Sequence, residues 1–225
     1  MFGILALAQD FLLTLSDSIA PLLGTGSVAG AVVLFTVCVR LLLLPLGYAQ
    51  ARAEVARVRL APASRALREK HKDDPMRMAR ELSALHKEAG TSMFAGIGPA
   101  LAGAPFLFVT YRLFSTDRDL LAHTLFDAPL GLHPLSGLFG EHALVLCALL
   151  ALLSAVAWVQ RRRTLSEPEA PSWVALLPFG TVVAALFVPL AAGVYLLTST
   201  TWTTVERPAL RRLVLLRDQR VVPGH

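Results

Sequence analysis

One cation, Arg40, stands inside an otherwise apolar stretch of the sequence, one helical turn after Thr36. A guanidinium placed in hydrocarbon costs at least about 2.5–3.5 kcal/mol on insertion scales, and an arginine side chain cannot escape this cost by losing its proton. Three explanations are open. The side chain reaches the water interface, it lines an ion path through a membrane, or it faces a water-filled cavity open on one side.

A second group of polar side chains lies in the last apolar stretch of the chain. These residues recur at helical spacing and share one face of a helix: Tyr195, Thr198, Ser199 and Trp202. Together with Arg40 and Thr36 they are the candidate lining of a polar site between helices. Hydroxyl groups in apolar helices also bond their own backbone or join neighbouring helices, so helix packing is the alternative interpretation.

Other kinds of chemistry lack their parts in this sequence. Ser154 and Ser199 have no His or Asp in the same apolar stretches, so a nucleophilic site is not indicated. The histidines lack metal-ligand spacing and are predicted to be solvated or interfacial: His71, His86, His123, His133, His142 and His225. Cys38 and Cys147 indicate no disulfide framework. The sequence therefore predicts no enzyme activity, no metal and no cofactor.

The composition shows what kind of elements must position these residues. The chain has 225 residues, of which 55% are hydrophobic and 16% are charged. Soluble domains carry about 25% charged residues, and disordered chains and nucleic-acid modules carry more still. Since the charges here leave long apolar stretches empty, the sequence predicts an all-α, multi-pass membrane protein.

A span needs roughly 20 apolar residues in helix. The predicted spans are residues 28–48, 93–113, 142–160, 173–187 and 189–205, and none of them contains Asp or Glu. The last two are short, and Phe187, Val188 and Pro189 mark the turn between them. The segments outside the spans are 1–27, 49–92, 114–141, 161–172 and 206–225.

The placement of Lys and Arg predicts the orientation of these spans. Of the 21 basic residues, 18 fall in the segments 49–92, 161–172 and 206–225, two (Arg112 and Arg118) lie between Arg112 and Glu141, at the end of the second span and in the loop after it, and Arg40 remains inside a span. Positively charged flanks stay in the cytoplasm. The N-terminus is therefore predicted outside and the C-terminus in the cytoplasm, with Trp158 and Trp173 at membrane interfaces.

The first 27 residues are predicted to form an external amphipathic helix rather than a signal peptide. The segment has no basic residue, and Asp10 and Asp17 interrupt its apolar run. Its apolar residues at helical spacing are Phe11, Leu12, Leu15, Ile19 and Leu22. Such a helix lies on the membrane surface. The alternative is a frayed apolar terminus.

Residues 49–92 are predicted to form a cytoplasmic helical hairpin. The chain turns at Lys72, Asp73, Asp74 and Pro75, where Asp74 caps a helix that Pro75 begins. Pro62 is expected to restart the helix before this turn. Two interpretations of the hairpin are open: a solvated loop that folds, or a basic, mobile lever that meets a nascent chain, a ribosome or anionic lipid.

The sequence resembles the YidC/Oxa/Alb family of membrane protein insertases from about Asp10 to Arg212. The motifs that carry the resemblance are VRLLLLPL at 39–46, KHKDDP at 70–75, LHKEAG at 85–90, Pro99 with Pro105, and the stretch from Tyr195 to Trp202. The resemblance implies five spans in this orientation and a hydrophilic groove open to cytoplasm and lipid. It favours the cavity for Arg40, and implies that substrate slides along Tyr195 and residues 199–202.

The sequence also departs from the family pattern. Gly103 stands where many relatives carry a groove Gln, and the basic tail after Arg212 is short. We expect a compact type in the bacterial plasma membrane, without a lipobox cysteine or a large external domain before the first span.

The function implied by the resemblance is insertion and folding of newly made membrane proteins without nucleotide hydrolysis. Its partners would be nascent membrane proteins and lipids, with the ribosome and the Sec translocon as further candidates. No specific nucleic acid is expected, and the monomer would suffice. The alternative is a small anion channel or transporter with Arg40 as the ion site.

Overall fold

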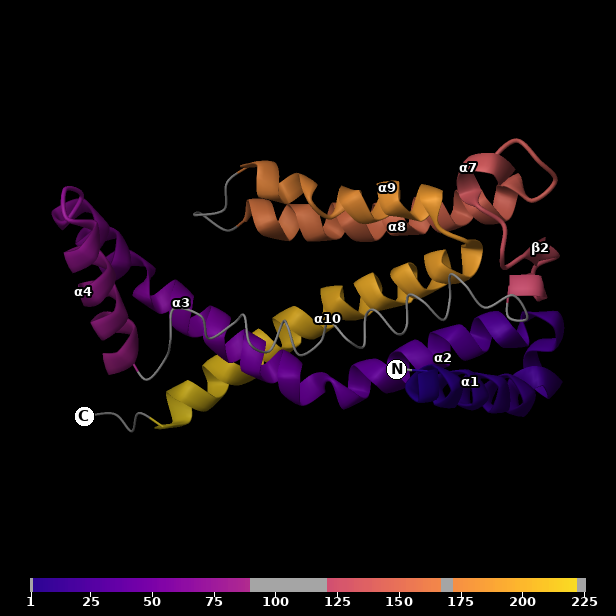
Figure 1. The fold of residues 1–225 in the computed structure, drawn as a ribbon, viewed down its shortest axis with the longest axis horizontal. Helices are drawn as coiled ribbons and strands as arrows, with labels where there is room; N and C mark the ends of the chain where they lie inside the picture. Colours follow the sequence, from indigo (N-terminus) through magenta and orange to yellow (C-terminus); the bar gives the residue numbers. More distant parts are fainter. Residues whose placement is uncertain (1, 90–120, 167–171, 222–225) are drawn as a thin grey trace. The chain divides into compact units, whose positions relative to one another are not determined.

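The computed structural model describes residues 2–89, 121–166 and 172–221, and nearly all of these residues are helical (Figure 1). The all-α fold class predicted from the sequence is confirmed. The chain forms two compact units, Met1–Leu42 with Phe106–Val205 and Leu43–Pro105 with Glu206–His225. The predicted second span, 93–113, with Pro99, Gly103 and Pro105, lies outside the described residues.

The first unit begins with a pair of helices, α1 (Phe2–Leu23) and α2 (Ser27–Leu42), joined by the 3-10 turn η1 (Gly24–Gly26) (Figure 1). Leu12 of α1 is fully buried, and Ile19 packs against the same core. The Phe11 ring lies 6.1 Å from that of Phe35 on α2. The apolar face expected of the N-terminal helix thus packs partly on α2, although Leu22 is 84% exposed.

A short irregular segment follows the undescribed part of this unit. It holds a two-stranded antiparallel hairpin, β1 (Thr124–Leu125) with β2 (Ala128–Pro129), and the one-turn helix α7 (Pro134–Gly137). Phe126 and Asp127 form its turn with positive φ angles of 50° and 64°. The segment is therefore compact and tightly turned, and its Leu130 and Leu132 carbonyls accept hydrogen bonds from the first residues of the last helix.

The remaining helices of the first unit are α8 (Ala143–Leu165), η2 (Ser172–Leu176), α9 (Phe179–Phe187) and the start of α10 (Leu190–Val221). Helix α8 packs against α9 (Figure 1). It is also the one helix of the described chain that is long and apolar enough to cross a membrane unbroken. Val188 is extended between α9 and α10, which confirms the break predicted at Pro189.

The first unit buries one continuous apolar core. Leu146, Leu149 and Leu153 recur at helical spacing on α8 and face the fully or nearly buried start of α10. Gly193 of α10 allows the closest approach, because a Cβ added there would lie 2.6 Å from Cδ2 of Leu149. The beginning of α10 is therefore held firmly before its polar face starts.

The predicted first span is not one uninterrupted helix. Helix α2 ends at Leu42, and α3 (Leu44–Lys70) begins two residues later with Pro45 in its first turn. Pro45 has no N–H for the Leu41 carbonyl, and its ring crowds that carbonyl, so the helix breaks there. Arg40 consequently lies in the last turn of α2 and not in the middle of a longer helix.

The second unit contains α3, α4 (Pro75–Glu88) and the end of α10. Helices α3 and α4 pack against each other, while Ala51, Val55 and Val214 form a small core between α3 and α10. Pro62 lies inside α3 and does not restart it, so this prediction was wrong. Its ring would leave the Val58 carbonyl without a helical partner, and Val58 is in an exposed part of α3 where water replaces that bond.

Candidate functional site

Arg40 contacts the polar face of the last helix. Its Nη2 donates a hydrogen bond to the Ser199 hydroxyl, which joins α2 to α10 inside the first unit. Ser199 is buried and Arg40 is only partly buried. In the described residues no carboxylate pairs with Arg40, so its positive charge is solvated by a neutral dipole and is not cancelled.

Two aromatic side chains extend this contact along α10. Tyr195 lies one turn before Ser199, is buried, and interacts with both Ser199 and Arg40. Trp202 lies one turn after Ser199, and its buried indole N–H has no hydrogen-bond partner in the part of the chain that the structure describes. Tyr195, Ser199 and Trp202 therefore present a continuous polar face beside the cation, with one donor still unused.

The two threonines of the predicted lining use their hydroxyls differently. Thr36 donates to the Val32 carbonyl at 2.7 Å, and Thr198 donates to the Val194 carbonyl at 2.9 Å. Both are bonds to the preceding turn of the same helix, which is the alternative that the sequence left open. The structure therefore brings Arg40, Tyr195 and Ser199 together and places Trp202 one turn further along α10, while the hydroxyls of Thr36 and Thr198 stay with their own backbones.

The polar part of α10 is held at both ends. At its start, the free N–H groups of Leu190 and Ala191 donate to the Leu132 and Leu130 carbonyls at 2.9 Å each. Near the other end, Gln160 of α8 donates to the Thr204 hydroxyl at 2.7 Å.

Arg163 of α8 adds a bond to the Thr204 carbonyl. Gln160 has no predicted role, because it stands at the end of an apolar stretch where it marks only the boundary of a span. Its carboxamide could have been noticed as the last polar side chain before the arginines. The structure shows it joining two helices, which is a common use of amides in apolar surroundings.

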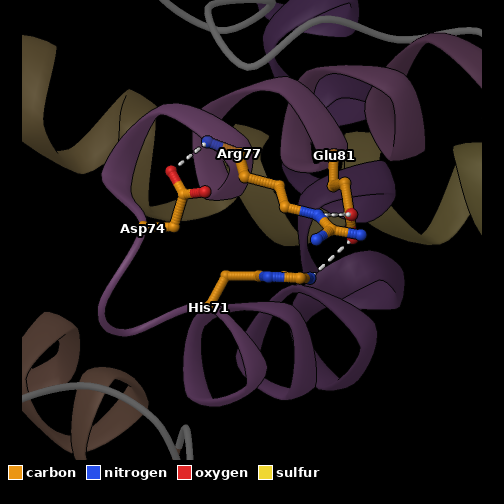
Figure 2. Close-up of polar contacts among 4 residues, drawn as sticks. All are labelled: His71, Asp74, Arg77 and Glu81. Carbon is orange, nitrogen blue, oxygen red and sulfur yellow. Dashed lines mark hydrogen bonds and ion pairs between the residues drawn. The ribbon is translucent and has the colours of Figure 1, made fainter.

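A second polar cluster lies at the turn between α3 and α4 (Figure 2). The Asp74 carboxylate accepts a hydrogen bond from the Arg77 backbone N–H at 2.9 Å, so Asp74 caps α4 as predicted. One turn on, Glu81 pairs with Arg77 through Oε1 at 3.1 Å and with His71 Nε2 through Oε2 at 2.9 Å. The bond to Arg77, reinforced by His71, holds the pKa of the Glu81 carboxyl below its usual value.

The prediction that all six histidines are solvated or interfacial was wrong for two of them. His71 and His86 are each only 8% exposed. His71 is buried at the turn against Glu81, and the His86 ring hydrogen-bonds through Nδ1 to the Leu82 carbonyl at 2.8 Å. Lys72 and Asp73, by contrast, are exposed at the tip of the turn.

Among the described residues, helices with apolar outer surfaces, a cation bonded to a hydroxyl between two of them, and a charged helical hairpin are typical of a helical membrane protein. A family model described as "60Kd inner membrane protein" matches residues 20–215. The chain belongs to this family, which is the YidC/Oxa/Alb family that the motifs resemble, and it is a bacterial inner membrane protein.

Individual relatives support the same assignment. The chain is similar to proteins named membrane protein insertase YidC from Aquifex aeolicus, 34% identical over 96 residues covering 43% of this chain and 19% of the relative. It is 26% identical to that of Streptomyces avermitilis over 207 residues, covering 77% of this chain and 48% of the relative. That of Acidiphilium cryptum is 30% identical over 173 residues, covering 70% and 28%. The chain thus spans less than half of the length of these relatives.

Proposed function

We propose that this protein inserts newly made membrane proteins into the bilayer and helps them to fold, through a hydrated groove in which Arg40 and Ser199 lie. The names of the relatives support insertion, since those of Aquifex, Streptomyces and Acidiphilium are all called insertases. None of those names supports the alternative of an anion channel. The proposed clients are short, single-spanning or weakly charged membrane proteins.

The observation that carries the proposal is the partner of Arg40. A guanidinium bonded to the Ser199 hydroxyl presents its full positive charge to a substrate, whereas a guanidinium paired with a carboxylate would form a pair with no net charge. In surroundings of reduced dielectric such a charge attracts an acidic residue more strongly than it does in water. Arg40 would thus draw the polar external segment of a substrate part of the way across the membrane.

The energy for transfer would come from the substrate itself. A substrate helix that leaves the groove for lipid gains about 25 cal/mol for each Å² of apolar surface removed from water. The protein then lowers a barrier and needs no nucleotide. Short helices such as α9 support this role, because a short span thins the bilayer around it at a modest cost per ångström.

The finer arrangement belongs to the same proposal. Five spans would place the α3–α4 hairpin and the end of α10 in the cytoplasm, where their basic residues meet nascent chains and anionic lipid. The exposed Lys72 and Asp73 at the hairpin tip would be the first residues encountered there. The ribosome and the Sec translocon are the proposed partners that deliver substrate.

Site-specific crosslinking tests the proposal. A photoreactive residue replaces Ser199 in one variant and Leu152, exposed on α8, in another, and each is offered a ribosome-stalled, single-spanning chain. The expected result is a crosslink to the substrate's span from position 199 and not from position 152. Equal crosslinking from both positions would mean that the substrate meets the protein through lipid, and the groove would be abandoned.

Reconstitution separates insertion from the channel alternative. Liposomes that contain the full chain should promote insertion of a short test substrate, and Arg40→Ala should reduce it. Thr36→Val is the matched control on the same helix, because the Thr36 hydroxyl bonds only its own backbone. Chloride flux that depends on Arg40, without any insertion, would instead establish the channel.

A further inference from the structure

The cytoplasmic end proposed for α8 carries three consecutive arginines after an exposed tryptophan. Trp158 is 46% exposed, and the guanidinium carbons of Arg161 and Arg162 lie 5.2 and 5.4 Å from its ring centroid. Arg161 and Arg162 follow Trp158 by three and four positions, so all three side chains occupy one face of the helix. These three residues lie on α8, which among the described helices is the one long and apolar enough to cross a membrane unbroken.

Stacking fixes these cations without neutralising them. A guanidinium held over an aromatic face keeps its N–H donors free at the edge, in a fork that matches a phosphate group. In the described part of the chain neither Arg161 nor Arg162 is paired with a carboxylate. Arg163 differs from both, because its guanidinium is bonded to the Thr204 carbonyl on α10.

The position of the stack identifies the occupant. Indole rings at the end of a membrane-crossing helix sit at the level of the lipid head groups. Two unpaired guanidinium groups at that depth meet lipid phosphates before any soluble anion. We propose that Arg161 and Arg162, held on the Trp158 ring, bind the phosphate of an anionic phospholipid of the inner leaflet. The inference rests on α8 crossing the membrane and not on insertase activity.

Native mass spectrometry of the full-length protein in mixed micelles tests this site. Phosphatidylglycerol and phosphatidylcholine are offered together, and the lipids that remain bound are counted. The wild type is expected to retain phosphatidylglycerol preferentially. Arg161→Gln with Arg162→Gln should weaken that retention by about fivefold for each arginine removed.

Two sets of control variants distinguish a specific lipid-binding site from general attraction of anionic lipid by the positive charge of the protein. Arg207→Gln with Arg212→Gln removes the same charge from exposed positions of α10 and should leave most of the preference intact. Trp158→Leu keeps both arginines but removes the ring and should lose the preference, which Trp158→Phe should largely restore. Equal losses from the two arginine pairs, or no effect of Trp158→Leu, would overturn the proposal.

Competition identifies the source of the phosphate. Inorganic phosphate at millimolar concentration should not displace the bound lipid, and displacement would mean a site for a soluble anion. Glu167 and Glu169 follow in the sequence outside the described residues. If a lipid preference appears only after both are changed to Gln, the arginines serve an internal ion pair and the proposal fails. An unchanged melting temperature in each variant shows that the fold is intact.

Discussion

Arg40 keeps a permanent positive charge between apolar helices, because its partner among the described residues is a hydroxyl and not a carboxylate. Such a neutral partner accepts from one of the five guanidinium N–H groups and leaves the positive charge available to a transient ligand. A buried ion pair would have been electrically silent toward a substrate. The residue therefore has the properties of a recognition group, which a purely structural arginine would not need.

The first prediction concerns the charge of Arg40 and that of its substrate. Arg40→Lys should retain most insertion of a substrate with an acidic external segment, since attraction needs the charge more than the fork. Arg40→Gln should reduce it about tenfold or more, because a charge pair about 4 Å apart contributes up to about 4 kcal/mol at an effective dielectric of 20. Protease protection of the inserted substrate in liposomes measures both.

A matched substrate supplies the control. When its acidic residues are changed to Asn or Gln, wild type and Arg40→Gln should insert it equally well. A persistent difference with the neutral substrate would show that Arg40 holds the helices in place and does not attract the client.

Individual side chains show how much of the candidate site can be predicted from the sequence. The spacing of Tyr195, Ser199 and Trp202 identified one polar face, and the structure sets that face against Arg40. The sequence could not tell which hydroxyls bond their own helix, because Ser and Thr at the same spacing do either. Nor could it reveal that His71 is buried, since burial there depends on how two helices close over the turn.

Elements are positioned by a few local signals that differ in strength. Pro45 and Pro62 both fall within helical patterns, yet only the first coincides with a break. The difference lies in the surroundings, because water reaches the carbonyl that Pro62 leaves unpaired but is scarce in an apolar stretch. The sequence analysis predicted neither the break at Leu43 nor the continuity of α3, because proline alone does not tell which of the two outcomes its surroundings favour.

The packing of α4 on α3 should depend on pH through the Glu81 carboxyl (Figure 2). A carboxyl whose pKa is lowered in the folded state stabilises that state at neutral pH, and this contribution is lost as the pH falls from the usual carboxyl range through the lowered pKa. The Arg77 guanidinium and the His71 ring face it, and Asp74 is the other carboxylate of the cluster. Closure of α4 on α3 should thus weaken below about pH 4.

Spin labels at positions 68 and 83, both exposed, measure this closure in the full chain after replacement of Cys38 and Cys147. The distance distribution of the wild-type hairpin should broaden on acidification. With Glu81→Gln it should be broad at every pH and show no acid transition. A Glu81→Gln hairpin that stays closed and still opens in acid would assign the transition to another group.

Two helical glycines predict opposite effects on the packing of the first unit. Gly180→Ala on α9 should stabilise the protein by up to about 1 kcal/mol, since a Cβ there meets nothing within 4 Å and Ala favours helix. Gly193→Ala should give no such gain and should destabilise, because its Cβ would displace the buried Leu149 side chain at a cost of about 1–3 kcal/mol. Thermal unfolding in detergent compares the two. A gain for both would show that Leu149 has room to move.

The distribution of charge along the chain predicts the orientation of the whole molecule in the membrane. The apolar surfaces of α8 and α9 need lipid, while α3, α4 and the end of α10 carry most of the basic residues. The sequence predicted the all-α class and the break before α10, because both follow from composition and from proline. It could not show that the chain divides into two compact units, since that depends on contacts between residues far apart in the chain.

The last prediction concerns orientation in the membrane. In a variant without Cys38 and Cys147, a cysteine at Asp127, in the turn between β1 and β2, should react with a membrane-impermeant maleimide in intact cells. A cysteine at Arg80, exposed on α4, should react only after the inner membrane is opened. The physical reason is that moving 18 of the 21 basic residues across the membrane, instead of two, opposes both the positive-inside bias and the membrane potential. Labelling of position 80 in intact cells, with position 127 protected, would reverse the orientation and move the proposed lipid site to the outer leaflet.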